Sequence, residues 1–317
     1  MCRNRTADRT DQFRVNPFSA REKQTLRIPA VVPYASLGMP ENFQLLHGVN
    51  IVSLSINTPG PVAASRLARL GASVTKVEPP TGDPLKTFAG GWYDSLSSGQ
   101  TTVALDLKSP DGRAQLDSLL SQADLLLASY RPSALARLGL DWERLHTRFP
   151  RLCFAGIIGY PPPQEEKSGH DLTYLAETGL VTPPELPSTL FVDLAGAERC
   201  ASQALALLLH FARTGEAGCA VISLYDCAEE LSAPVKAGLT NPGGILGGGS
   251  PFYGVYQASE GWVAIAALEP HFAQRLVSEL KIAQPEHAAF ERAFLERSAS
   301  EWEEWAAERD LPVVRVR

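Results

Sequence analysis

From about His47 onward, short apolar and β-branched runs alternate with stretches whose apolar residues recur every three or four positions. The run at 49–55 predicts a buried strand, the β-branched stretch at 73–78 predicts the next strand, and the amphipathic stretch at 61–70 predicts a helix between them. A proline opens this helix and Gly71 ends it, as is common at the two ends of a helix. Strand, helix and strand in this order predict a βαβ unit.

The same alternation continues to residue 158 and predicts the rest of a sheet. Strands that alternate with helices favour an α/β fold, here a Rossmann-like, doubly wound parallel sheet with helices on both faces. The further strands are expected at 102–107, 124–130 and 151–158, and the helices at 109–122, directly after Pro132, and at 142–149.

A long helix and a smaller unit are predicted in the second half of the chain. The stretch at 195–214 predicts one long helix that ends at Gly215. Apolar runs at 252–257 and 262–268 are separated by Ser259-Glu260-Gly261, which predicts a hairpin. With helices around 272–280 and 302–308, the hairpin would form a smaller α+β domain.

These elements divide the chain into four expected parts. A large Rossmann-like domain spans 46–195, linking helices span 196–247, and the small α+β domain spans 248–317. Residues 1–45 contain arginines interrupted by acidic residues and show no clean apolar face, which favours a flexible extension over an organelle transit peptide. The glycine cluster at 243–249 is interpreted either as a mobile linker or as a loop that closes over a substrate.

Composition narrows the possible functions. The 317 residues carry a net charge of -6, which argues against nucleic acid as a partner, because such binding depends on a positive surface. No apolar run is long enough to span a bilayer and the first residues lack a secretory signal, so we expect no membrane partner and a cytoplasmic location. The five cysteines form no CxxC pair, which predicts reduced, buried thiols and no metal site.

One histidine and three carboxylates are the candidate catalytic residues: His170 and Asp171 in Ser168-Gly169-His170-Asp171, and Asp193 and Glu269 further along. This set suggests proton transfer at carbon. Each member also has a structural interpretation. His170 could be a hydrogen-bonded structural histidine, Asp193 could cap a helix that starts at Leu194, and Glu269 could cap the helix after Pro270.

The expected sheet lacks the usual phosphate-binding glycine motifs, but two arginines offer an anion site. Arg131 stands at a strand end beside a helix that Pro132 opens, and Arg137 lies about a turn and a half further on. Guanidinium groups can hold separated phosphates. The alternative is a pair of solvated surface arginines.

An ordered series of motifs resembles one known family over residues 46 to about 316. The series comprises Gly60-Pro61, Leu70-Gly71-Ala72, Lys76-Val77-Glu78, Gly82-Asp83-Pro84, Leu105-Asp106-Leu107-Lys108-Ser109, Tyr130-Arg131-Pro132, Leu138-Gly139-Leu140, Ser168-Gly169-His170-Asp171, Gly248-Gly249-Ser250-Pro251-Phe252-Tyr253 and Glu269-Pro270. It resembles the family III CoA-transferase (CaiB/BaiF-like) superfamily, and within it the α-methylacyl-CoA racemase branch.

The resemblance implies a ligand and a set of contacts. The large domain would bind an acyl-CoA substrate, with no cofactor beyond the CoA moiety of that substrate. Arg131 and Arg137 would contact CoA, and Ala104, Leu105, Asp106 and Leu107 would line the adenine side. Members form interlocked homodimers through a segment that follows a strand like 311–316. This sequence ends at Arg317, so we expect a homodimer but leave open whether its subunits interlock; the helix from Ala195 offers an apolar face to a partner.

The superfamily contains two chemistries, and the candidate residues bear on both. Transferase members use an aspartate like Asp171 to attack an acyl-CoA. Racemase members have a histidine like His170, an aspartate like Asp193 and a glutamate like Glu269.

A racemase needs a base on one face of the α-carbon and an acid on the other, the roles implied for His170 and Asp193. Glu269 would orient the imidazole, burial would raise the pKa of Asp193, and backbone N–H groups at 169–171 would bind the enolate oxygen. We therefore predict an acyl-CoA racemase or epimerase, with a CoA-transferase that uses Asp171 as the alternative.

Two departures from the family pattern concern CoA. Pro79 stands where relatives have an arginine, and Ser97-Ser98-Gly99-Gln100 replaces a basic segment. A third interpretation is therefore a divergent relative that has lost CoA-dependent catalysis and binds another ligand.

Overall fold

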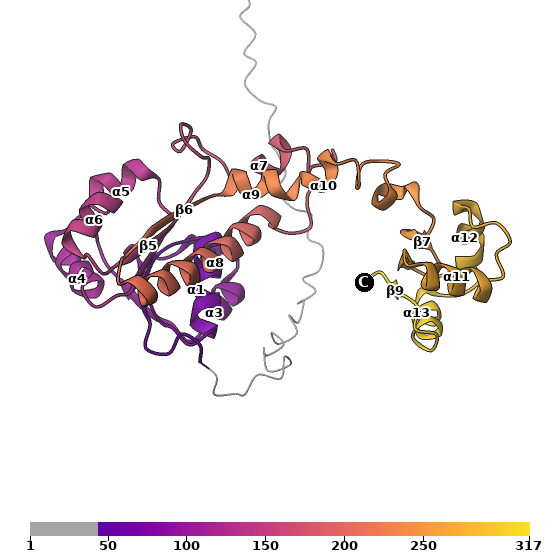
Figure 1. Ribbon diagram of the computed structural model, residues 1–317, viewed down its shortest axis with the longest axis horizontal. Coiled ribbons are helices and arrows are strands. Elements are labelled where there is room, and N and C mark those ends of the chain that lie inside the picture. Colours follow the sequence, from indigo (N-terminus) through magenta and orange to yellow (C-terminus); the bar gives the residue numbers. More distant parts are fainter. Residues whose placement is uncertain (1–43) are drawn as a thin grey trace, which may run out of the picture. The chain divides into compact units, whose positions relative to one another are not determined.

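The computed structural model describes residues 44–317, so nearly all of the predicted flexible extension lies outside the described residues. Its main element is a six-stranded, wholly parallel sheet in the order β3-β2-β1-β4-β5-β6 (Figure 1). The strands are β1 (Asn50–Leu54), β2 (Ser73–Glu78), β3 (Thr101–Ala104), β4 (Leu125–Ala128), β5 (Cys153–Ile158) and β6 (Cys219–Ser223). The predicted α/β fold with a parallel sheet is confirmed.

The first βαβ unit forms where the sequence predicts it. Helix α1 (Pro59–Arg69) begins at a proline and buries Val62 and Leu67. The chain then turns at Gly71 with a φ of +100°, where a side chain would also meet Gln44 at 2.6 Å. Glycine at this position lets the chain turn directly from α1 into β2.

Helices cover both faces of the sheet, because successive strand residues point to opposite sides. Leu125 and Leu127 of β4 pack with α1 and α8 (Phe191–Thr214), whereas Leu126 packs with the helices on the other face. Figure 1 shows α8 alongside α1, with α4, α5 and α6 grouped apart from them. These three helices are α4 (Pro110–Leu120), α5 (Pro132–Leu138) and α6 (Trp142–Arg148). The predicted doubly wound arrangement is confirmed.

Two predictions about the middle of the chain are corrected. The stretch at 196–247, expected to hold linking helices, also contributes β6 to the edge of the sheet. Its weak signal has a physical reason: only Ile222 and Ser223 of this edge strand are buried, and Val221 is exposed. Helix α8 also starts at Phe191 rather than at 195.

Several short helices have no strong sequence signal. They are α2 (Pro84–Phe88), α3 (Gly90–Ser97), α7 (Asp171–Glu177), α9 (Leu224–Leu231), α10 (Ala233–Lys236) and a kinked, partly helical turn, η2 (Ile245–Gly249). The last contains the glycine cluster, where a side chain at Gly247 would lie 1.9 Å from the Asn241 carbonyl oxygen. Close backbone packing therefore explains that glycine.

The last part of the chain forms a smaller α+β unit. The predicted hairpin is confirmed as β7 (Tyr253–Gln257) and β8 (Trp262–Ala266), and β9 (Val313–Arg315) adds a third antiparallel strand. Its core contains Phe290, Phe294 and Trp302 from the helices. The helices are α11 (Pro270–Glu279), α12 (His287–Phe294) and α13 (Ala299–Ala307).

Two sequence-based expectations concern the whole chain. None of the helices within residues 44–317 is both long and apolar enough to cross a membrane. The cysteines of this part are free thiols, as predicted, and Cys153, Cys200 and Cys227 are buried. Cys219, however, is exposed, because it lies on the edge strand β6.

Candidate active site

A cavity of about 170 Å³ opens at the carboxyl ends of three central strands. Asn57 follows β1, Arg131 follows β4, and Gly159 follows β5. The strand order reverses between β1 and β4, and ligands of doubly wound sheets bind at such a reversal. The fold alone therefore marks this cavity as a candidate site.

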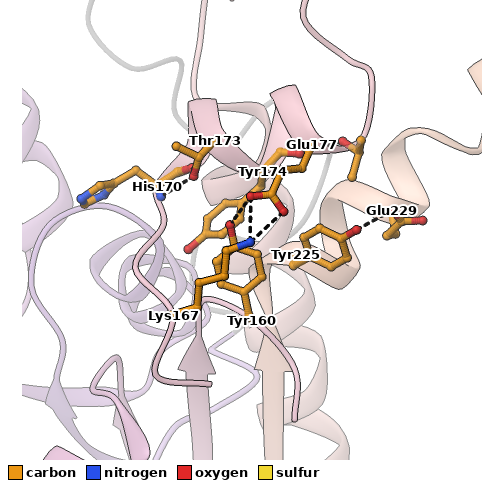
Figure 2. A network of polar contacts seen from close by, with 9 residues as sticks. Tyr160, Lys167, His170, Thr173, Tyr174, Glu177, Tyr225 and Glu229 are labelled. Carbon is orange, nitrogen blue, oxygen red and sulfur yellow. Dashed lines mark hydrogen bonds and ion pairs between the residues drawn. The ribbon is translucent and has the colours of Figure 1, made fainter. Parts of the chain in front are cut away.

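His170 and Asp193, the predicted acid/base pair, both line this cavity although 23 positions separate them in sequence. His170 precedes α7, and its backbone N–H donates to the Thr173 hydroxyl at 3.0 Å. Its exposed imidazole makes no hydrogen bond with any described residue, and Figure 2 shows it pointing away from the polar groups around Glu177. The ring is free to act on a ligand.

Asp193 lies in the first turn of α8, in a position that favours its protonated form. Burial, together with the negative charge of Asp171, raises the pKa of Asp193 to about 7. The predicted rise is confirmed, and a carboxyl with such a pKa can both give and take a proton near neutral pH. It does not cap α8, because that helix starts before it.

Asp171 has a structural task in this site. Its carboxylate is buried and Oδ1 accepts the backbone N–H groups of Val192 and Asp193 at 2.7 and 2.9 Å. These donors belong to the first turn of α8, where N–H groups lack helical partners. Asp171 therefore anchors the start of α8 and with it the position of Asp193.

Glu269 is not brought to the cavity. It is the exposed residue before α11, and among the described residues its side chain neither caps that helix nor forms an ion pair. Its assignment to the imidazole of His170 stays a prediction.

The two arginines proposed to hold an anion have different surroundings. Arg131 lines the cavity and donates to the Ser168 hydroxyl at 2.9 Å, whereas Arg137 is exposed in the last turn of α5. At the N-terminus of α5, where we expected a ligand anion, the donor groups instead form hydrogen bonds within the chain. The Glu166 carboxylate accepts the N–H and the hydroxyl of Ser133, both at 2.9 Å, and these bonds lower the pKa of Glu166.

Residues 104–107 lie away from the proton-transfer pair. Ala104 ends β3, Leu105 is buried, and the exposed Asp106 accepts the Lys108 N–H at 2.9 Å. Leu107 lines a larger cavity of about 580 Å³ that α4, α5 and α6 enclose. This cavity contains none of the candidate catalytic residues, so the smaller cavity is the better candidate for the chemistry.

A buried ion network supports the cavity wall, and sequence reasoning missed its role. The Lys76 Nζ lies 2.7 Å from both the Glu78 and the Asp83 carboxylates, and Tyr93 donates to Glu78 at 2.7 Å. Asp83 also accepts the N–H of Asn57 at 2.9 Å, which holds Asn57 in a left-handed conformation at the cavity rim. The Gly82-Asp83-Pro84 motif was the available signal.

A second polar cluster borders the cavity on the side of α7 (Figure 2). Lys167 pairs with Glu177 at 3.0 Å, and the Tyr160 hydroxyl donates to the same carboxylate at 2.7 Å. Both bonds lower the pKa of Glu177. Tyr174, also missed by sequence reasoning, stands beside Tyr160 with ring centroids 5.1 Å apart and lines the cavity.

Within residues 44–317, no three histidine, cysteine, aspartate or glutamate side chains are grouped so that they could hold a metal ion. The polar side chains that line the cavity are those of Asn57, Ser129, Arg131, Glu165, Lys167, His170, Tyr174 and Asp193.

Comparisons with known proteins point to one family. The family model described as CoA-transferase family III matches residues 46–317. Human α-methylacyl-CoA racemase is 31% identical over 290 residues, which cover 81% of this chain and 74% of that protein. The (R)-2-hydroxy-4-methylpentanoate CoA-transferase of Clostridioides difficile is 26% identical and covers 86% of this chain and 79% of its own length. A crystal structure of a hypothetical protein from Mycobacterium tuberculosis matches with a TM-score of 0.75 at 25% identity, covering 86% of both chains.

Proposed function

Because this chain belongs to CoA-transferase family III, whose members act on CoA thioesters, we propose that it inverts the α-carbon of a 2-methylacyl-CoA-type thioester. The observation that carries the proposal is that His170 and Asp193 line one cavity and that the pKa of Asp193 is about 7. A human relative named as a racemase supports the same reaction.

In the proposed reaction, two groups exchange protons with the same carbon. One of them removes the α-proton, and the C–H electron pair moves into an enolate while the carbonyl oxygen gains negative charge. The other group then delivers a proton to the opposite face. Asp193 suits this alternation because a pKa near 7 gives it comparable amounts of acid and base form at neutral pH. His170 offers an imidazole, the side chain that most often serves as a general acid or base.

The thioester must be held so that its α-carbon sits between the two groups. Arg131, at the cavity wall, is the proposed contact for the CoA phosphates nearest the thioester, with Arg137 further out on α5. Leu107 and its neighbours are the proposed adenine contacts. No cofactor beyond the substrate's own CoA takes part, and Glu269 is kept as the proposed partner of the imidazole.

The test is incubation of the enzyme with one enantiomer of a 2-methylacyl-CoA in deuterated water. We expect inversion and deuterium at the α-carbon, and we expect both to be lost in His170→Ala and Asp193→Ala. Replacement of Glu304, an exposed carboxylate on α13, by alanine is the matched control and should leave the rate unchanged. Folded, substrate-binding enzyme that exchanges no α-proton would refute the proposal.

A CoA-transferase is the second candidate, because a transferase is among the relatives and Asp171 is the residue that the family resemblance implies as its nucleophile. In that reaction, the Asp171 carboxylate would attack the thioester carbonyl and form an acyl anhydride as the CoA thiolate leaves. Hydroxylamine would trap this acyl group as a hydroxamate. Trapping at Asp171, together with CoA transfer to an added carboxylic acid, would favour the transferase.

A further inference from the structure

The cavity contains a buried phenol without a partner. Tyr174, on α7, is 1% exposed, and its hydroxyl makes no hydrogen bond with any residue of the described part of the chain. Figure 2 shows no contact drawn from this hydroxyl, whereas the hydroxyls of Tyr160 and Tyr225 each reach a carboxylate. Because Tyr174 lines the cavity and its hydroxyl has no acceptor among the described residues, this O–H group is free to donate a hydrogen bond to a ligand.

The backbone makes room for this phenol at two points. A side chain at Gly159 would lie 2.6 Å from the Tyr174 hydroxyl, and one at Gly169 would lie 2.5 Å from the ring. Neither distance is compatible with a real Cβ atom. With the edge of the Tyr160 ring against it, the phenol is fixed between the end of β5 and the loop before His170. A donor held in this way is oriented before any ligand arrives.

The charges around Tyr174 keep its proton in place. Burial raises the pKa of Tyr174 well above its ordinary range, and electrostatic interactions with Tyr160, Asp193 and Glu177 raise it further, against a smaller opposite effect of Arg131. The phenol therefore stays protonated at any pH at which the enzyme works. It can donate a hydrogen bond but cannot serve as a base.

We propose that the Tyr174 hydroxyl is a further catalytic residue, which donates a hydrogen bond to the thioester oxygen as that oxygen becomes the enolate oxygen. The inference rests on the proposed racemase function, since the same cavity holds His170 and Asp193. When one base takes the α-proton, the carbonyl π electrons move onto oxygen, and the Tyr174 O–H bond stays intact. The N–H of His170, one of the backbone donors expected for this oxygen, is instead bonded to Thr173.

The experiment compares α-proton exchange in the wild-type enzyme, Tyr174→Phe and Tyr225→Phe. Phenylalanine keeps the ring and removes only the hydroxyl. Loss of one donor to such an oxygen lowers kcat by about 100- to 1000-fold, so we expect a fall of that order for Tyr174→Phe with KM changed less than about threefold. Tyr225→Phe removes a hydroxyl that bonds to Glu229 at 3.1 Å outside the cavity, and it should keep the wild-type rate.

The outcomes separate the two proposals. Wild-type enzyme that exchanges no α-proton refutes the racemase function itself. If wild-type enzyme exchanges and Tyr174→Phe exchanges equally fast, or changes KM rather than kcat, the role of Tyr174 is refuted. Should Tyr174→Phe fail to fold, 3-fluorotyrosine at position 174 retains the phenol and changes its acidity. The exchange rate should then follow that acidity, and an unchanged rate would overturn the inference.

Discussion

Replacing Asp193 with asparagine should make this protein more stable at alkaline pH. Asparagine has nearly the same shape as aspartate and carries no charge. In the wild-type protein, burial and the neighbouring Asp171 oppose the charged form of Asp193. Removing that charge relieves a cost that the folded protein otherwise bears at neutral and alkaline pH.

The magnitude and the pH range follow from the pKa of Asp193. The pKa rises from 3.8 to about 7 on folding, so between these values the folded chain holds a proton that the unfolded chain releases. Stability is therefore lost as pH rises from about 4 to about 7, and it stays low above. Three pKa units correspond to about 4 kcal/mol, and partial solvent exposure of the side chain reduces this to about 2 kcal/mol.

Thermal unfolding at pH 5 and pH 8 measures this effect. We expect Asp193→Asn to unfold about 4–8 °C above wild type at pH 8, with most of the difference gone at pH 5. Asp226→Asn is the matched control, because Asp226 also lies in the first turn of a helix but is exposed and outside the cavity. Equal stability of wild type and Asp193→Asn at pH 8 would refute a high pKa for Asp193.

Two further predictions concern the groups that hold the cavity together. Asp171→Ala should lower the free energy of unfolding by about 2 kcal/mol, because two N–H groups of α8 lose their acceptor. It should also shift the part of the pH–rate profile that depends on Asp193 to lower pH, because a neighbouring negative charge is removed. An unshifted profile would contradict the electrostatic effect of Asp171 on Asp193. Lys76→Met should lower the free energy of unfolding, measured in urea, by about 3–5 kcal/mol, because two buried carboxylates lose their cation. A decrease below about 1 kcal/mol would show that this ion network does not stabilise the cavity wall.

Much of the fold could be predicted because its central strands are buried on both faces. Runs such as Leu125–Ala128 and Cys153–Ile158 are therefore continuous apolar segments between amphipathic helices. The edge strand β6 escaped prediction for the opposite reason, since only its last two residues are buried. Helix α7 is too short to show the apolar periodicity of a helix clearly. It also starts at Asp171, which the sequence analysis considered only as a candidate catalytic residue.

The site could be predicted only in part. His170 and Asp193 were identified by their motifs, but the sequence does not reveal that Asp171 would be used to anchor the helix that carries Asp193. The start of α5 looked like an anion site because its proline and arginines are local features. In the structure, the Glu166 carboxylate, more than thirty positions away in sequence, accepts the hydrogen bonds that an anion was expected to accept there. A contact between residues so far apart cannot be read from the local sequence pattern. Tyr174 was missed because its importance depends on two glycines packing against it.

The most direct test of the central claim is the isotope content of both enantiomers at low conversion of a single 2-methylacyl-CoA enantiomer in deuterated water. If His170 and Asp193 act from opposite faces of the α-carbon, the inverted product should carry deuterium from the solvent, whereas unreacted substrate should remain largely protiated. Inverted product that carries only protium, or folded enzyme that binds the thioester and yields no inverted product, would contradict the account.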